Sequence, residues 1–389
     1  MPRLAGYDWR GKNSKQITYI AANNSIQEFY KIEGEDWALN ELTAPNAFQP
    51  WSVSGFEWSP LKEKDVVFNT PDGHIHLLAT NLDAKAPLHV DLFDGSHIAG
   101  SANIPMASTN TVTDVCGYEW SALNTRQIVY SGGELWQSLG LDPHWHYGDL
   151  GQASGTPFKR GVWSPGYDWP AGATKQVLGF PGVNEGHLYW AGVTKGAGWT
   201  SVDLSVSAGL PSTSPSSTAW SKVIAWASGF AAKSSDCVAC VDVVGELYLL
   251  ARAPGEKSWS VEPLAPFIPP TVGGVGASVW GLDWLAGGYR QVYFVTNDDG
   301  HIHELYQAFD NLVGAWGHAD LTKETGAPPA RKEFHPILAV FEWRAGSSKQ
   351  VAYVGVDGHL HELSVAVNSN WQHRQLTGKA PFLSAPLPL

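Results

Sequence analysis

One unit repeats along this chain, and that repetition constrains the fold more than any other feature. The clearest copy, residues 341–376, reads Phe-Glu-Trp, then KQVAY, then DGHLHEL, then a tryptophan with a leucine five residues later. The copy before it reads Leu-Asp-Trp, RQVYF, DGHIHEL and again a tryptophan with a leucine five residues later. Such a repeat has to be recognised first, because a missed repeat leads to the wrong fold.

Seven copies of this unit cover the chain. Their first tryptophans are Trp9, Trp58, Trp120, Trp169, Trp226, Trp284 and Trp343. The second tryptophan, with its leucine, recurs in six copies, at Trp37, Trp145, Trp199, Trp259, Trp316 and Trp371. Copy 2 has Pro87 at this position but keeps Leu92. We expect one domain over 1–389, with repeats at approximately 4–53, 54–114, 115–164, 165–221, 222–279, 280–337 and 338–389.

Each copy predicts four short β-strands. Runs of aromatic and β-branched residues alternate with turn residues, which is typical of an all-β domain. The Asp-Gly between the second and third runs indicates a tight hairpin. Four antiparallel strands repeated around an axis form a β-propeller, whereas an open solenoid would need atypical terminal copies, which the chain lacks. The sequence therefore predicts an all-β, seven-bladed β-propeller of four-stranded antiparallel blades, with its 19 tryptophans filling the wedges between blades.

Composition excludes several partners. The net charge is −12 and the basic residues are dispersed, so we expect no nucleic-acid binding. No apolar run of about 18 residues is present, so we expect no membrane insertion. Three cysteines do not make a disulfide framework, and Cys237 and Cys240 should point to opposite faces of one strand as core residues. We expect a protein that is cytoplasmic, or secreted without a visible signal peptide, and that can form oligomers.

A repeated charge pattern predicts an ion pair in each copy. In six copies the residue before the first tryptophan is acidic and the residue six positions after that tryptophan is basic, as in Glu342 and Lys349. Copy 5 has Ala225 and Ala232 instead. The two positions should face each other across the first hairpin, so we interpret them as an internal ion pair of the blade.

Three histidine pairs lie two residues apart on the third run, at His74/His76, His301/His303 and His359/His361. Two imidazoles on one strand face could bind zinc. Each pair lies in its own copy and no third ligand converges on it in the sequence. We therefore expect the rings to pack against aromatic neighbours, and we expect no metal and no cofactor.

The motifs favour carbohydrate binding over catalysis. The chain has no Gly-x-Ser-x-Gly elbow, no phosphate-binding glycine loop and no Ser-x-Asp-x-Gly-x-x-Trp box. Aromatic rings can cover the apolar face of a sugar while charged groups bind its hydroxyls, and crevices between blades offer both. The candidate binding residues are Trp37, Trp199, Trp259, Trp316, Trp371, Glu28, Glu304, Glu362, His303, His361, Arg290 and Lys349.

The units DGHIHEL…W…DLT and KQVAYVGVDGHLHEL resemble the repeats of seven-bladed lectins of the Photorhabdus type, and the layout is similar to that of six-bladed fungal fucose lectins. This resemblance implies a multivalent lectin for fucosylated or O-methylated glycans, with sites between blades. The fungal Arg–Glu–Trp set would fall on Arg290/Glu304/Trp316, Lys349/Glu362/Trp371 and Lys15/Glu28/Trp37.

Two other functions stay open. The first is a propeller-fold polysaccharide lyase, or another carbohydrate-active enzyme, with one site at the axial funnel. In that case the 93–114 insertion and His74, His76, His97 and His144 would carry the chemistry. The second is a protein-interaction propeller that binds no sugar. A lectin predicts similar sites in several copies, whereas an enzyme predicts one site unlike the others.

Overall fold

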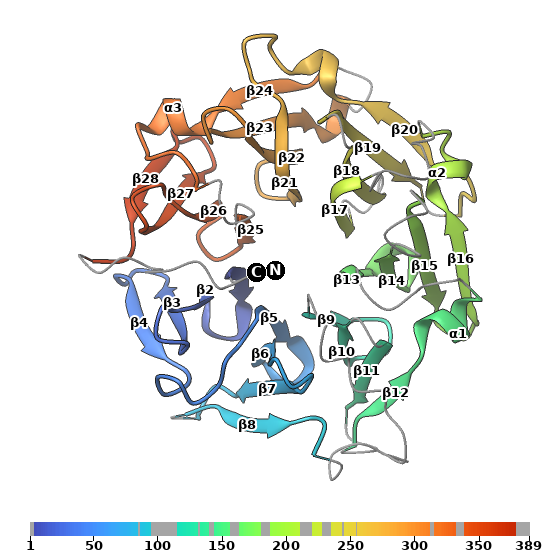
Figure 1. Ribbon diagram of the computed structural model, residues 1–389, viewed down its shortest axis with the longest axis vertical. Coiled ribbons are helices and arrows are strands. Elements are labelled where there is room, and N and C mark those ends of the chain that lie inside the picture. Colours follow the sequence, from blue (N-terminus) through green and yellow to red (C-terminus); the bar gives the residue numbers. More distant parts are fainter. Residues whose placement is uncertain are drawn as a thin grey trace.

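The computed structural model has seven four-stranded antiparallel sheets arranged as blades around a central axis, which confirms the predicted seven-bladed β-propeller (Figure 1). The structure describes residues 4–84, 86–94, 115–130, 133–139, 144–155, 163–179, 187–210, 220–227, 235–242, 245–253, 255–311, 315–331 and 338–378. Most of the 93–114 insertion and His97 lie outside these residues. Within the described residues, no helix is long and apolar enough to cross a membrane.

Every blade is built from one continuous stretch of chain, with its first strand nearest the axis and its fourth at the rim (Figure 1). Blades 1 to 3 consist of β1 (Leu4–Trp9), β2 (Ser14–Ile20), β3 (Ile26–Ile32) and β4 (Ala38–Glu41); β5 (Ser52–Trp58), β6 (Glu63–Asn69), β7 (Ile75–Thr80) and β8 (Leu88–Asp91); and β9 (Val115–Trp120), β10 (Thr125–Tyr130), β11 (Gly133–Ser138) and β12 (His146–Gly148). Blades 4 and 5 consist of β13 (Trp163–Trp169), β14 (Thr174–Gly179), β15 (Tyr189–Thr194) and β16 (Trp199–Asp203); and β17 (Trp220–Ala227), β18 (Asp236–Asp242), β19 (Leu247–Arg252) and β20 (Ser260–Pro263). Blades 6 and 7 consist of β21 (Val275–Trp284), β22 (Tyr289–Thr296), β23 (Ile302–Ala308) and β24 (Gly317–Asp320); and β25 (Leu338–Trp343), β26 (Ser348–Val354), β27 (Leu360–Ala366) and β28 (Gln372–Gln375).

Short helices follow the fourth strand in three blades. They are α1 (Leu150–Ser154), α2 (Leu204–Ser207) and α3 (Leu321–Thr325). An aspartate caps each helix by accepting a backbone N–H, as Asp320 does from Lys323 at 2.9 Å. The leucine that follows each second tryptophan in these blades is thereby anchored in the core, where Leu321 is fully buried.

Tight turns define the blade hairpins. The predicted Asp-Gly hairpins are present, and the glycines Gly73, Gly300 and Gly358 have φ of 87°, 75° and 78°. These left-handed values favour glycine. In each of these turns an aspartate side chain accepts a backbone N–H two residues later, for example His359 N to Asp357 Oδ1 at 3.0 Å. The turn chemistry therefore fixes where the third strand of each of these blades begins.

Neighbouring blades contact each other through an aromatic ring placed over a glycine. The ring of Tyr7 lies so close to Gly55 that a Cβ there would come within 2.2 Å of it. The ring of Phe341 covers Gly6 in the same way, at 2.3 Å from a Cβ placed there. Phe341 belongs to blade 7 and Gly6 to blade 1. The first and last blades are therefore joined by the same contact as blades 1 and 2, without an exchanged strand.

The apolar core lies between the blades. Cys240 belongs to a cluster shared by blades 4 and 5, whereas Cys237 belongs to one shared by blades 5 and 6. The two cysteines therefore point to opposite faces of β18, as the sequence predicted. Burial raises the pKa of the Cys237 thiol to about 12, which keeps it protonated and inert.

The glycine contact leads to a stability prediction. We expect Gly55→Ala to destabilise the protein by about 1–3 kcal/mol, because the added methyl group overpacks the contact with Tyr7. Denaturant unfolding of the purified variant measures this loss. Gly198→Ala is the matched control, because a Cβ at Gly198 meets nothing within 4 Å, and we expect a change within about 0.5 kcal/mol. Equal effects at the two positions would contradict the role given to this contact.

Candidate functional site

A buried cation lies between two tryptophans in most of the crevices between blades. In the crevice of blades 6 and 7, Lys349 Nζ is 4.8 Å from the ring centroid of Trp284 and 4.8 Å from that of Trp371. One ring ends the first strand of the preceding blade, and the other precedes the fourth strand of the blade that carries the lysine. We call this arrangement the cation cage. The cages with at least two tryptophan partners centre on Lys15, Arg126, Lys175, Arg252 and Lys349.

A carboxylate completes the cage. Lys349 bonds Glu304 of blade 6, both side chains being buried. Lys15 bonds Glu362 of blade 7 at 2.5 Å, and Lys175 bonds Glu134 of blade 3 at 2.6 Å. Burial lowers the pKa of Lys349, and the Glu304 carboxylate opposes that shift. In each of these crevices the bridge joins a blade to the one before it.

Blade 5 reaches the same arrangement from a different strand. Ala232, at the usual basic position, lies outside the described residues. Instead, Arg252 at the end of β19 lies 5.4 Å from Trp169 and 4.8 Å from Trp259. It donates to Asp236, its partner across the strands, at 2.6 Å. A guanidinium therefore occupies the crevice of blades 4 and 5 although the repeat has lost its own lysine.

This geometry corrects the three predicted binding sets, each of which drew on a single copy. Lys349 is opposite Val365, whereas Glu362 is opposite Ala352. Glu362 therefore shares a face of the blade with Ala352, three residues after Lys349. Residues three apart on a strand point to opposite faces, so Lys349 and Glu362 face different crevices. The sets Lys349/Glu362/Trp371, Arg290/Glu304/Trp316 and Lys15/Glu28/Trp37 are therefore wrong in their glutamates, whereas Lys349 does meet Trp371 and Lys15 does meet Trp37. Glu304 meets Lys349, Glu362 meets Lys15, and Glu28 meets Lys64.

The predicted ion pair within each first hairpin is also largely wrong. The two positions do face each other, as with Glu342 and Lys349, but the basic residue takes its carboxylate from inside the crevice. Glu57, Glu119, Asp168 and Glu342 instead accept a backbone N–H from the turn of the preceding blade, as Glu342 does from Ala286 at 3.0 Å. Asp283 accepts from Trp226 Nε1 at 2.9 Å. Only Arg290 lies near its own acid, with Nε 3.8 Å from Asp283 Oδ1, among the described residues. The N–H groups of these turns need acceptors when they are buried, and the carboxylates provide them.

The crevice of blades 6 and 7 opens into a cavity of about 630 Å³. Trp284, Trp371, Lys349 and Glu304 line it, together with His318 and rim residues that include Asn368, Ser369 and Asn370. Trp371 is half-buried, so part of its ring is accessible from the cavity. The cavity therefore combines an aromatic face with charged and amide groups that can hydrogen-bond a ligand.

Lys349 also has fewer partners than the other caged lysines. Lys15 bonds Gln350 at 2.8 Å besides its glutamate, and Lys175 bonds Gln127 at 3.0 Å. In blade 6 the equivalent Gln291 instead accepts from Tyr293 at 3.0 Å. Within the described residues Lys349 Nζ bonds Glu304 alone, and an ammonium carries three donors. Lys349 can thus donate to a molecule in the cavity.

The predicted site tryptophans divide into two groups. Trp37, Trp199 and Trp371 are half-buried, whereas Trp259 and Trp316 are buried in the cores between blades. Trp316 donates its Nε1–H to Glu262 at 3.1 Å. Only the first group has ring surface left for a ligand.

Sequence reasoning missed Glu134. Alignment of the third runs on their first apolar residues puts Gln137 at the glutamate position of copy 3. In the structure Glu134 is opposite Val129, three residues after Arg126, just as Glu362 is opposite Ala352, three residues after Lys349. Counting from the second strand, rather than aligning the third, would have identified it.

The predicted histidine packing is confirmed. The rings of His76, His303 and His361 stack on Phe68, Phe294 and Tyr353 at 4.8, 5.1 and 5.3 Å. His303 and His361 are buried and do not line the cavity of blades 6 and 7, where His318 does.

A second cavity of about 630 Å³ is lined mainly by residues of the first strands, and carboxylates surround it. They are Asp8, Glu57, Glu119, Asp168, Asp283 and Glu342. Burial raises the pKa of Asp8 and of Asp168 to about 6. The histidines proposed for a lyase, His74, His76 and His144, are not among its lining residues, and they do not form a catalytic set there.

No protein-family model and no curated protein matches this chain. Among solved structures, the chain is similar to the BP39L lectin from Burkholderia pseudomallei, with a TM-score of 0.66, 16% identity, and coverage of 95% of this chain and 97% of that one. It is also similar to AofleA from Arthrobotrys oligospora, with a TM-score of 0.51, 14% identity, and coverage of 99% and 91%. The six-bladed β-propeller lectin of Aleuria aurantia gives a TM-score of 0.49 at 13% identity, over 85% of this chain and 96% of that one. The likeness to the first two of these structures, at these identities, shows a shared fold.

The buried bridges lead to a double-mutant prediction. Lys64→Met leaves the buried Glu28 carboxylate without its cation, and we expect a loss of about 3–5 kcal/mol in unfolding free energy. Lys64→Met combined with Glu28→Gln should lose less than the single variant, because no buried charge remains. Denaturant unfolding of the two single variants and the double variant measures the coupling. Additive losses would contradict a direct bridge.

The axial carboxylates lead to a pH prediction. The folded-state pKa of Asp168 is raised from 3.8 to about 6, so the folded protein binds more protons than the unfolded chain between these values. Stability therefore falls as pH rises through this window. Asp168→Asn removes that dependence. We expect the free energy of unfolding of the variant, relative to that of the parent, to increase by about 1–2 kcal/mol from pH 4 to pH 7, a value lowered because the side chain is partly exposed. The same comparison with Asp36→Asn, whose side chain is 95% exposed, should show no such pH-dependent gain.

Proposed function

We propose that this protein is a multivalent carbohydrate-binding protein, a lectin, whose sites lie in crevices between blades. The crevice of blades 6 and 7 carries the proposal, because it places the half-buried Trp371 beside Lys349 at the edge of an open cavity. The indole offers an apolar face for sugar C–H groups. Lys349, Glu304 and the rim amides offer donors and acceptors for the hydroxyl groups.

Two further crevices repeat the lysine, the glutamate and the half-buried tryptophan. Lys15, Glu362 and Trp37 meet between blades 7 and 1, and Lys175, Glu134 and Trp199 meet between blades 3 and 4. In each, the tryptophan that precedes the fourth strand is half-buried. Because linked weak sites gain avidity by about 10²–10⁴ without new contacts, three such crevices suit binding to multivalent glycans.

The ligand class follows from resemblance. The BP39L structure is that of a lectin, and the repeat resembles those of fucose-binding propellers. We therefore propose fucosylated or O-methylated glycans as ligands, with glycoconjugates as the natural partners. Repetition of the cage over several blades favours a lectin over an enzyme with one unique site.

A glycan array that includes fucosylated and O-methylated sugars tests this function, followed by calorimetric titration with the best ligand. We expect binding at up to three equivalents per chain. Trp371→Ala should remove one equivalent, because it deletes the accessible ring of one crevice. Leu88→Ala is the control, an exposed residue in the blade that has Pro87 in place of the second tryptophan, and it should bind like the parent. An array without binding, or full stoichiometry in a folded Trp371→Ala variant, would overturn the proposal.

A further inference from the structure

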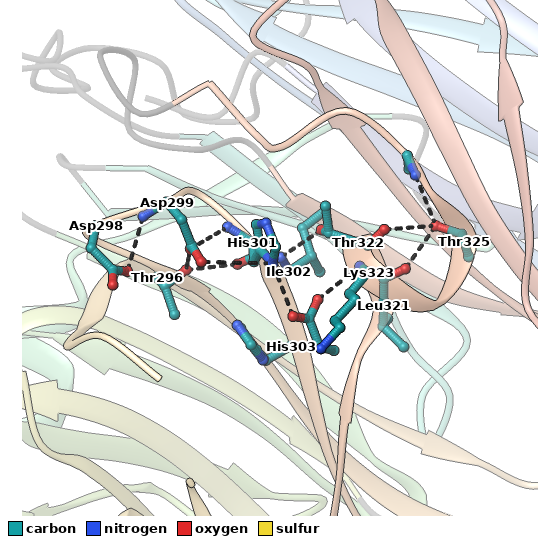
Figure 2. A network of polar contacts seen from close by, with 12 residues as sticks. Thr296, Asp298, Asp299, His301, Ile302, His303, Leu321, Thr322, Lys323 and Thr325 are labelled. Carbon is teal, nitrogen blue, oxygen red and sulfur yellow. Dashed lines mark hydrogen bonds and ion pairs between the residues drawn. The ribbon is translucent and has the colours of Figure 1, made fainter. Parts of the chain in front are cut away.

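Blade 6 brings three potential metal ligands together where its third strand begins (Figure 2). Asp299 lies in the turn before β23, His301 follows it, and His303 lies on β23. One ligand atom from each lies within 4.8 Å of the other two. Asp299 is exposed, His301 is half-buried and His303 is buried, so the cluster extends from the surface into the blade.

His303 provides the main evidence, because one of its ring nitrogens is buried without a partner. The side chain is 2% exposed. Its Nδ1 lies 3.0 Å from His318 Nε2, whereas its Nε2 has no hydrogen-bond partner among the described residues. Leaving a buried polar atom unsatisfied costs about 1–3 kcal/mol. With Nδ1 directed at His318, Nε2 is the nitrogen that remains to offer a lone pair.

His301 is held as ligating histidines commonly are. Its Nδ1 lies 2.9 Å from Asp320 Oδ2 and 3.7 Å from Asp299 Oδ2, and Asp320 is fixed in turn as the cap of α3. A carboxylate on one ring nitrogen orients the ring and increases the basicity of the other, which is the usual outer partner of a metal-bound imidazole.

The other two blades with the same motif use this nitrogen differently. In blade 7, His361 Nε2 lies 3.0 Å from Asp357 Oδ1. In blade 2, His76 Nε2 lies 3.3 Å from Thr70 Oγ1. Among the described residues only the blade 6 trio brings three ligand atoms together. The unpartnered nitrogen is therefore a feature of blade 6 and not a general property of the repeat.

We propose that Asp299, His301 and His303 bind one divalent transition-metal ion of the zinc class. Two imidazoles and one carboxylate form a three-ligand set that leaves a fourth position for water or a ligand. Ligands at about 2.0–2.2 Å from a tetrahedral ion lie roughly 3.3–3.6 Å apart, so ligand atoms that now lie up to 4.8 Å apart have to approach by up to about 1.2–1.5 Å. Asp299 can supply this movement from its exposed turn. The sequence alone had predicted no metal, because Asp299 did not stand out as a third ligand.

The proposed ion would be coupled to the crevice of blades 6 and 7. A metal on His303 Nε2 requires the proton to stay on Nδ1, which then donates to His318 Nε2. His318 lines the cavity of that crevice. Metal binding should thus be sensed by a residue of the cavity whether or not the cavity binds a sugar.

The test uses the full chain without an affinity tag, made metal-free with a chelator. Zn²⁺ is titrated by calorimetry and Co²⁺ by visible absorption. We expect one saturable equivalent, Co²⁺ bands typical of four-coordination, and shifts of the His303 and His318 ring signals in NMR spectra with Zn²⁺. His301→Gln and Asp299→Asn should each weaken binding by about tenfold or more.

Matched variants in blade 7 provide the control. His359→Gln and Asp357→Asn change the same motif where Nε2 is already engaged, and they should leave the affinity unchanged. Asp299→Asn keeps an oxygen that can accept from Thr296 and from His301 N, so loss of binding cannot be attributed to loss of the turn if the melting temperature is unchanged. No saturable binding below about 1 mM, or equal losses from the two sets of variants, would overturn the proposal.

Discussion

The buried cation between two tryptophans, with its carboxylate, is the interaction on which the arrangement of blades depends. An ammonium such as that of Lys349 cannot be buried alone, because its desolvation would cost several kcal/mol. Its carboxylate, Glu304, comes from the preceding blade. A blade that slipped along its neighbour would therefore separate a buried pair, so the bridges select one register between blades. The bridges thus specify how the blades align, whereas the aromatic and apolar contacts provide most of the buried surface.

The same interaction explains ring closure. Lys15 and Glu362 are separated by 347 residues, yet they form the bridge that Lys175 and Glu134 form between blades adjacent in sequence. Phe341 on Gly6 repeats the contact of Tyr7 on Gly55. Closure thus needs no special device at the chain ends, because the junction of blades 7 and 1 uses the contacts of the interior junctions. This also explains why the first and last copies retain the full repeat.

The sequence predicted the fold well because its evidence is local. The Trp spacing, the Asp-Gly turns and the alternation within each run all act inside one hairpin. The candidate site depends on which face a side chain takes, and there the prediction failed. Lys349 and Glu362 belong to one copy but face different crevices, and Glu134 was missed because the loop before it differs in length. Strand register would have corrected both, whereas the partnerless nitrogen of His303 follows only from three-dimensional packing.

Differences between copies of a structural motif show where this propeller departs from its own framework. All copies share one scaffold, so when a residue has a different partner in one blade, the equivalent residues of the other blades show what the unchanged arrangement looks like. Gln291 leaves the caged lysine that Gln350 and Gln127 contact in their own crevices, and the crevice it leaves is the one with a cavity beside Lys349. His303 lacks the hydrogen-bond partner for Nε2 that His361 and His76 have, among the described residues. Both departures occur in blade 6, at Gln291 on β22 and at His303 on β23, and His318 contacts His303 and lines the cavity beside Lys349. Copies 2 and 5 also depart from the repeat, at Pro87 and at Ala232, but the changes in blade 6 leave a lysine and an imidazole with unused hydrogen-bonding capacity, so blade 6 is the first place to look for a bound ligand.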